Sequence, residues 1–168
     1  MDFGLTNKRA FVGGGSRGIG KAIAIELARE GCDVVIASRT QSALEDTAKE
    51  IEDLTGRRII PLALDVTSRE QVDSIMAEGV LQLGGLEILV NSASLPGGSR
   101  SAVGPIDELD EDALLSDFDT KYVGALRCAR AYLTMRATEE YQEARVHRRA
   151  ALYDSRLIMT SQNYPSTI

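Results

Sequence analysis

The chain has 168 residues, a formal net charge of −6, 43% hydrophobic residues and 26% charged residues. This length suits one domain, and the composition is that of an ordinary globular protein. The acidic charge argues against nucleic acid or an anionic membrane as the main partner. Cys32 and Cys128 have no metal-ligand neighbours, and His147 cannot build a zinc site alone. We therefore expect no bound metal and two buried thiols. Because we find no signal peptide and no long apolar run, we also expect a cytoplasmic protein.

The N-terminal part predicts a strand, a glycine-rich turn, a helix and a second strand. Arg9 to Gly13 is a mostly apolar run, as in a parallel sheet that is covered on both faces. A helical pattern follows over Lys21 to Arg29 and stops at Gly31, with small alanines that allow close packing on the sheet. The second strand covers Asp33 to Ala37. Together these elements make one βαβ unit of the length that dinucleotide-binding domains use.

The turn Gly13–Gly20 indicates a phosphate-binding loop. Glycines let the backbone approach a ligand closely, and the N-terminus of the next helix presents free N–H groups to an anion. The run satisfies the general spacing G-x-G-x-x-G and the different spacing G-x-x-x-G-x-G. Gly15 to Lys21 also matches G-x-x-x-x-G-K, with Asp65 as a candidate magnesium ligand, so a nucleoside triphosphatase is a remote alternative. Ala22 argues against it, because the hydroxyl that would bind the metal is missing.

The end of the second strand bears on the choice of dinucleotide. An NAD enzyme needs a carboxylate there, some twenty residues past the glycines, to bind the ribose 2′-hydroxyl. This chain has Ser38-Arg39-Thr40 instead. The Arg39 guanidinium can donate two hydrogen bonds to the 2′-phosphate of NADP(H), and Arg17 is a candidate second donor. The alternative is that Arg39 lies in solvent without a ligand. We favour NADP(H) as the cofactor.

Two further helix and strand pairs follow. The first helix carries Leu44, Ala48, Ile51 and Leu54 on one face, and the strand after it covers Ile59 to Leu64. Because Pro61 lacks a backbone donor, that strand is expected at the edge of the sheet. Ser68 opens the second helix, Gly84-Gly85 ends it, and the fourth strand covers Leu86 to Asn91. The inner face of the second helix is predicted to hold Val72, Ile75, Met76, Val80 and Leu83.

A long helix is predicted from about Asp110. Its mid-helix Gly124 costs about 1 kcal/mol relative to alanine, which suggests close approach of another backbone or subunit. Residues 137–154 have the pattern of a charged, solvated helix. The inward face of the long helix is expected to carry Leu114, Phe118, Tyr122, Ala125, Ala129 and Leu133.

The spacing Gly14-x-x-x-Gly18-Ile19-Gly20, with Ser16-Arg17 inside it, resembles the short-chain dehydrogenase/reductase family, especially reductases of the 3-oxoacyl-carrier-protein type. Asp65-Val66 matches the family's adenine contact, and the segment Asn91-Ser92-Ala93-Ser94 resembles its Asn-Asn-Ala-Gly motif. The resemblance covers residues 5–135. Together with the loop and strand ends, it predicts cofactor binding by Gly14, Ser16, Arg17, Gly18, Ile19, Gly20, Ser38, Arg39, Asp65, Val66, Asn91 and Ala93.

The resemblance implies a fold, an activity and an assembly. The fold is a doubly wound, parallel α/β Rossmann sheet in a three-layer α/β/α arrangement, with one domain over residues 1–168 that is truncated after about the fifth strand. The activity is NADP(H)-dependent hydride transfer between a carbonyl and an alcohol on a small-molecule substrate. Family members often pair through the long helix, so we expect a dimer or a larger homo-oligomer.

The catalytic residues of the family match poorly. The family's Asn on the long helix aligns with Lys121, for which a lysine extending into solvent is an equally good interpretation. Residues 156–160 resemble the fifth strand, after which Ser161 is the candidate catalytic serine, one position before Gln162, where the family's serine is usual. The family's Tyr-x-x-x-Lys does not align: Tyr164 is too close to the strand, and its lysine position holds Ile168. Two hypotheses stay open, an active reductase and a catalytically inactive NADP-binding module or partner subunit.

Overall fold

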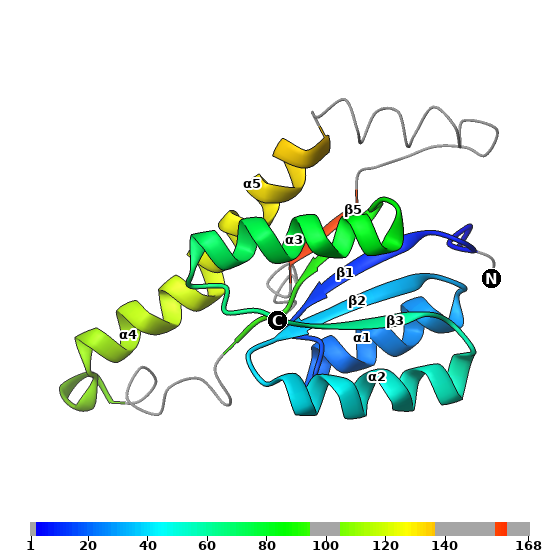
Figure 1. Cartoon of the computed structure of the whole chain (residues 1–168). Helices are drawn as coiled ribbons and strands as arrows, with labels where there is room; N and C mark the ends of the chain where they lie inside the picture. Colours follow the sequence, from blue (N-terminus) through cyan, green and yellow to red (C-terminus); the bar gives the residue numbers. More distant parts are fainter. Residues whose placement is uncertain (1–2, 95–104, 137–156, 161–168) are drawn as a thin grey trace.

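The sheet is parallel throughout and has the strand order β3-β2-β1-β4-β5 in the computed structural model, which describes residues 3–94, 105–136 and 157–160. Helices cover both of its faces (Figure 1). This arrangement confirms the predicted doubly wound α/β fold. The edge position expected for the Pro61 strand is also correct, because β3 lies at one end of the sheet. The strands are β1 Arg9–Gly13, β2 Asp33–Ser38, β3 Ile59–Ala63, β4 Ile88–Asn91 and β5 Leu157–Thr160.

One face of the sheet is covered by α1 (Gly18–Arg29) and α2 (Gln41–Thr55). Side chains alternate along each strand, so Val12 and Ile36 point to this face while Phe11 and Val35 point to the other. Gly56 ends α2 in the left-handed conformation (φ 66°) that glycine adopts without steric cost. The predicted inner face of α2 is wrong at one position, because Leu54, in the last turn of the helix, is 57% exposed.

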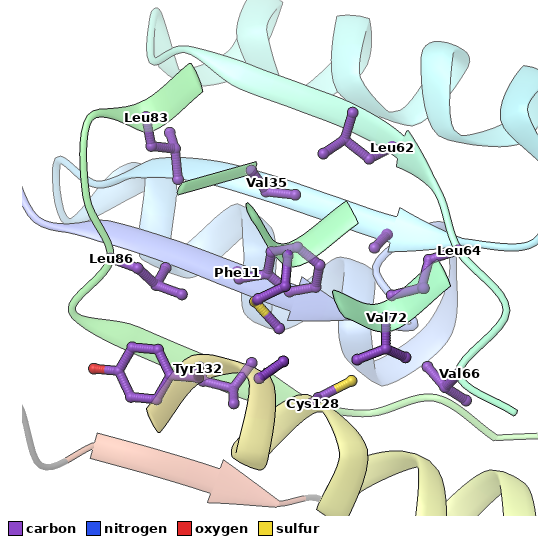
Figure 2. Packing of buried hydrophobic residues seen from close by; sticks show 14 of the residues in the cluster. Phe11, Val35, Leu62, Leu64, Val66, Val72, Leu83, Leu86, Cys128 and Tyr132 are labelled. Carbon is purple, nitrogen blue, oxygen red and sulfur yellow. The ribbon is translucent and has the colours of Figure 1, made fainter. Parts of the chain in front are cut away.

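The other face is covered by α3 (Arg69–Leu83) and α5 (Gly124–Arg136). Figure 2 shows how Phe11 and Val35 of the sheet pack with Val72 of α3 and with Cys128 and Tyr132 of α5. The helix α3 begins as predicted, since the Ser68 side chain accepts a hydrogen bond from the backbone of Gln71. Both cysteines are buried free thiols, as expected, and burial raises the pKa of each to about 11.

The predicted long helix consists of three consecutive segments, α4 (Glu111–Phe118), η3 (Asp119–Val123) and α5. A short 3-10 turn, η2 (Ile106–Glu108), precedes α4, which the Asp110 side chain caps by accepting from the backbone of Ala113 at 2.7 Å. The π-helical turn η3 then joins α4 to α5. A π turn contains an extra residue, so the side chains after it are rotated relative to an uninterrupted α-helix.

The predicted inward face of this helix is wrong. The buried positions are Asp117, Gly124, Cys128, Ala131 and Tyr132. Ala125 and Ala129 are half-buried, whereas Leu114, Phe118, Tyr122 and Leu133 are exposed. The mismatch is present on both sides of η3, so the face with most of the large apolar side chains is not the face that the fold buries.

None of the helices in the described part of the chain has both the length and the apolar character needed to cross a membrane. Within the same residues, no three His, Cys, Asp or Glu side chains gather in a way that could hold a metal ion.

Candidate functional site

A cleft of about 820 Å³ opens at the carboxyl ends of strands β1 to β4. From β1 the chain continues outward to β2 and β3, and it then crosses to β4 on the other side of β1. In open α/β sheets, ligands bind at the point where the strand order reverses, here between β1 and β4. The cleft is lined by residue 14, residues 16–20, residues 37–40 and 43, residues 64–67, residues 92–94, and residues 116, 120 and 121. Eleven of the twelve predicted cofactor positions are among them, and Asn91 is the exception.

The glycine loop is held between its two neighbouring strands. The backbone amides of Gly14 and Gly15 both donate to Ala37 O in β2, at 2.7 and 3.2 Å, and Ser92 N donates to Gly13 O at 2.8 Å. Gly14 has a φ of +81°, and a Cβ there would lie 2.5 Å from Ser92 O. The loop thus depends on glycine both for its conformation and for its closeness to β4.

The N-terminus of α1 faces this cleft. Arg17 is the N-cap residue, and no side chain caps the helix. Gly18, Ile19 and Gly20 form the first turn and line the cleft. Helix termini leave their first N–H groups without helical partners, so this turn can bind an anion. A Cβ on Gly20 would collide with Gly14 O, so glycine is needed here for the close packing of α1 on the loop.

Two arginines border the cleft. Arg17 comes from the glycine loop and Arg39 follows β2, and both are exposed. Ser38 also lines the cleft, and its hydroxyl oxygen is buried without a hydrogen-bond partner in the described structure. A buried hydroxyl without a partner is costly, so this position suits a ligand that hydrogen-bonds to it.

The loop after β3 contributes a negative charge to the same cleft. Asp65 Oδ1 accepts hydrogen bonds from Thr67 N at 2.9 Å and Thr67 Oγ1 at 2.7 Å. These bonds lower the pKa of the Asp65 carboxyl, and the positive charges of Arg39 and Arg127 lower it further. The carboxylate is therefore ionised at neutral pH and available as an acceptor.

The same loop explains Gly124, which was expected to mark a close contact with another backbone or subunit. A Cβ on Gly124 would lie 2.8 Å from Val66 Cγ2 and 3.3 Å from Val66 O, so the close neighbour is a cleft-lining residue of the same chain. Arg127 adds a second link, donating to Val66 O at 3.2 Å and to Asp119 Oδ1 at 2.9 Å. The start of α5 thus supports the wall of the cleft, and Gly124 gives no reason to expect a subunit contact.

The end of β4 differs from the prediction at one residue. Ser92 and Ala93 line the cleft, but Asn91 is only 8% exposed and lies in the strand beneath it. The Asn91 Nδ2 atom has no hydrogen-bond partner within the described residues.

Lys121 lies in the wall opposite the strand ends, in the π turn. Its ammonium donates to Asp117 Oδ2 at 2.7 Å, so the interpretation as a lysine extending into solvent is wrong. Asp117 is 8% exposed and lies on α4 among exposed acidic residues. Sequence reasoning missed it because no periodic pattern marks a single buried aspartate. Ser161, Gln162 and Tyr164 lie outside the described residues.

Comparison with known proteins identifies the family. The family model described as short chain dehydrogenase matches residues 8–145, so the chain belongs to the short-chain dehydrogenase/reductase family, whose members are oxidoreductases. The comparisons confirm the family but not the narrower resemblance to 3-oxoacyl-carrier-protein reductases.

Three relatives illustrate the match. The peroxisomal 2,4-dienoyl-CoA reductase of Danio rerio is 41% identical over 90 residues, which are 54% of this chain and 30% of that protein. The crystal structure of L-sorbose reductase from Gluconobacter frateurii, complexed with NADPH and L-sorbose, is 33% identical, with a TM-score of 0.72 and coverage of 82% of this chain and 51% of the other. A short chain dehydrogenase from Burkholderia cenocepacia in complex with NADP is 33% identical, with a TM-score of 0.68 and coverage of 77% and 51%. The chain thus spans about half or less of each relative.

Proposed function

We propose that this chain binds NADP(H) in the cleft and forms the coenzyme-binding part of a carbonyl/alcohol oxidoreductase. The observation that carries the proposal is the convergence, at the switch point of the sheet, of a glycine loop, an uncapped helix N-terminus and two arginines. Two of the solved relatives are complexes with NADPH or NADP, which supports the choice of dinucleotide.

The residues present fit this coenzyme. A Cβ on Gly14 or Gly20 would collide with neighbouring backbone, so both glycines let the loop pack tightly and keep the first turn of α1 at the cleft, where a pyrophosphate can bind. Arg17, Arg39 and the Ser38 hydroxyl supply donors for the 2′-phosphate. Asp65 and Val66 would bind the adenine, and Ser92 and Ala93 lie toward the nicotinamide half. When bound, NADPH supplies a hydride to a carbonyl carbon.

Cofactor choice gives the first prediction. NADPH should bind at least tenfold more tightly than NADH, because charge-assisted hydrogen bonds to the 2′-phosphate contribute about 1.5–3 kcal/mol each. Arg39→Ala should reduce that ratio several-fold by weakening NADPH binding while leaving NADH binding unchanged. Isothermal titration of the purified chain with NADPH, NADH and ATP measures all three affinities.

Arg29→Ala is the matched control for this titration. Arg29 is an exposed arginine in the last turn of α1 that pairs with Glu26, so the variant removes the same charge far from the cleft. It should keep the wild-type ratio. Equal affinities of the wild type for NADPH and NADH would contradict the proposal, and tight ATP binding with magnesium-dependent hydrolysis would favour the nucleoside triphosphatase instead.

Lys121 favours a second candidate function, an NADP-binding module without turnover. It occupies the family's Asn position and its ammonium is engaged by Asp117, so it cannot offer the acceptor that an amide supplies. Within these 168 residues, no tyrosine is followed four positions later by a lysine. A turnover assay separates the two candidates.

We also propose that the chain associates with itself. Large apolar side chains are exposed along α4, η3 and α5, and the rings of Phe118 and Tyr122 stack with centroids 4.8 Å apart. Exposed apolar surface of this extent favours association, so the chain should form a dimer or larger assembly through these helices. The side chains are Leu114, Leu115, Phe118, Tyr122, Leu126 and Leu133.

Light scattering at micromolar concentration tests this assembly. The wild type should have at least twice the monomer mass, and the double variant Phe118→Ser/Leu126→Ser should shift it to the monomer. Leu54→Ser is the control, because Leu54 is an exposed apolar residue of α2, which covers the other face of the sheet. A monomeric wild type would show that the exposed residues do not drive pairing.

A further inference from the structure

The inward face of α2 contains one polar side chain whose position the apolar pattern does not explain. Thr47 is 4% exposed and lies among Leu44, Ala48 and Ile51, which pack in the core on that side of the sheet. Its Oγ1 donates a hydrogen bond to Ser16 O at 3.0 Å. The side chain of Thr47 in α2 thus binds the backbone of the phosphate-binding loop.

Ser16 is at the centre of that loop. On one side of it, Gly14 N and Gly15 N donate to Ala37 O of β2, and on the other side Arg17 occupies the N-cap position of α1. The Thr47 hydroxyl binds the peptide unit that joins these two parts. The Ser16 carbonyl belongs to the peptide group between Ser16 and Arg17. The orientation of this peptide group therefore also sets the backbone direction at Arg17.

The same hydrogen bond links the two chain segments that carry Arg17 and Arg39. The helix α2 begins at Gln41, directly after Arg39 and Thr40, so Thr47 is rigidly joined to the segment that carries Arg39. Its partner Ser16 adjoins Arg17. A second link between α1 and α2, the ion pair of Lys21 with Glu50, is more exposed and is therefore more strongly screened by solvent.

We propose that Thr47 is a positioning residue that fixes the glycine loop relative to α2 and so sets the selectivity for NADP(H) over NAD(H). This proposal rests on the proposed function. Loss of the hydroxyl would leave a loop carbonyl without its partner and allow the Ser16–Arg17 peptide to rotate. Arg17 would then be displaced from the 2′-phosphate, whereas the N–H groups of α1 would keep their place at the pyrophosphate.

Two substitutions separate the hydroxyl from the packing. Thr47→Val keeps the shape and removes the donor, and Thr47→Ser keeps the donor. The purified chain is titrated with NADPH and NADH, and thermal unfolding is measured without ligand. Thr47→Val should weaken NADPH binding about tenfold, as expected for one lost hydrogen bond, and NADH binding less than threefold. Thr47→Ser should stay within about twofold of the wild type for both.

A double-mutant cycle with Arg17→Ala tests the route of the effect. If Thr47 acts by placing Arg17, then Thr47→Val should change the NADPH/NADH ratio less than twofold once Arg17 is already alanine. A purely structural role predicts instead that Thr47→Val weakens NADPH and NADH binding by the same factor in both backgrounds, leaves their ratio unchanged and lowers the melting temperature.

The possible failures are distinguishable. A wild type without NADPH preference overturns the proposed function and this selectivity role with it. A wild type that prefers NADPH, with a Thr47→Val variant that keeps the same ratio, overturns only the role of Thr47. If Thr47→Val does not fold, Thr47→Ala, which removes the hydroxyl without placing a methyl group at its position, serves as the variant. Failure of both to fold would show that Thr47 is a core residue and would refute the proposal.

Discussion

Gly14→Ala should weaken NADPH binding at least about a hundredfold and lower the free energy of unfolding by about 3 kcal/mol or more. At a φ of +81°, alanine is strained, and its Cβ would lie 2.5 Å from Ser92 O, 2.6 Å from Ser92 C and 2.7 Å from Ala93 N. These atoms belong to the backbone at the end of β4 and cannot move aside as a flexible side chain would. The glycine loop must therefore shift, and the cleft loses its shape.

The glycine run supplies matched controls for this variant. Gly13→Ala meets only Val90 O at 3.6 Å, which is ordinary contact, so it should bind NADPH within about threefold of the wild type. Gly18→Ala has a positive φ of 56° but no protein atom near its Cβ, so its loss of unfolding free energy reports backbone strain without collision and should be intermediate. Titration calorimetry and urea denaturation measure both effects. Equal affinities for the Gly13→Ala and Gly14→Ala variants would contradict the close approach to β4.

The glycine run and the sheet could be predicted because their patterns are local. Apolar strands, a helix after the glycines and a proline in an edge strand each follow from a few consecutive residues. The cleft followed from the order of the strands, since that order brings Arg17, Arg39 and Asp65 to one edge of the sheet. The family resemblance supplied the role of Asp65, which no pattern of its own indicates.

The parts that failed depend on contacts between distant residues. Along α4 and α5 the large apolar side chains are exposed, while the buried positions include Asp117, Gly124 and Cys128, so hydrophobicity alone selects the wrong face. Gly124 did signal a close neighbour, but only the fold identifies that neighbour as Val66. Thr47 and Asp117 are single buried polar residues whose partners lie on other turns or other elements, so periodicity cannot find them.

The purified 168-residue chain should bind NADPH and yet turn over 3-oxoacyl and simple ketone substrates at least about 100-fold more slowly than a full-length family reductase. Hydride transfer to a carbonyl develops alkoxide charge, and a positioned proton donor is worth typically 10²–10⁴-fold. The family uses a tyrosine acidified by a lysine, and the Tyr-x-x-x-Lys pattern does not align here. Lys121 does not replace it, because its ammonium is already bound to Asp117 in the cleft wall.

Consumption of NADPH, followed by its absorbance, measures this rate, and titration of the same preparation shows that the cleft is intact. Lys121→Asn restores the amide found in the family, so it is the informative variant. It should leave the rate within about threefold of the wild type, because an amide alone cannot supply the missing proton donor. Measurable oxidation of NADPH that vanishes on Ser161→Ala or Tyr164→Phe would refute this prediction, since it would mean that the C-terminal residues provide the acid by a different arrangement.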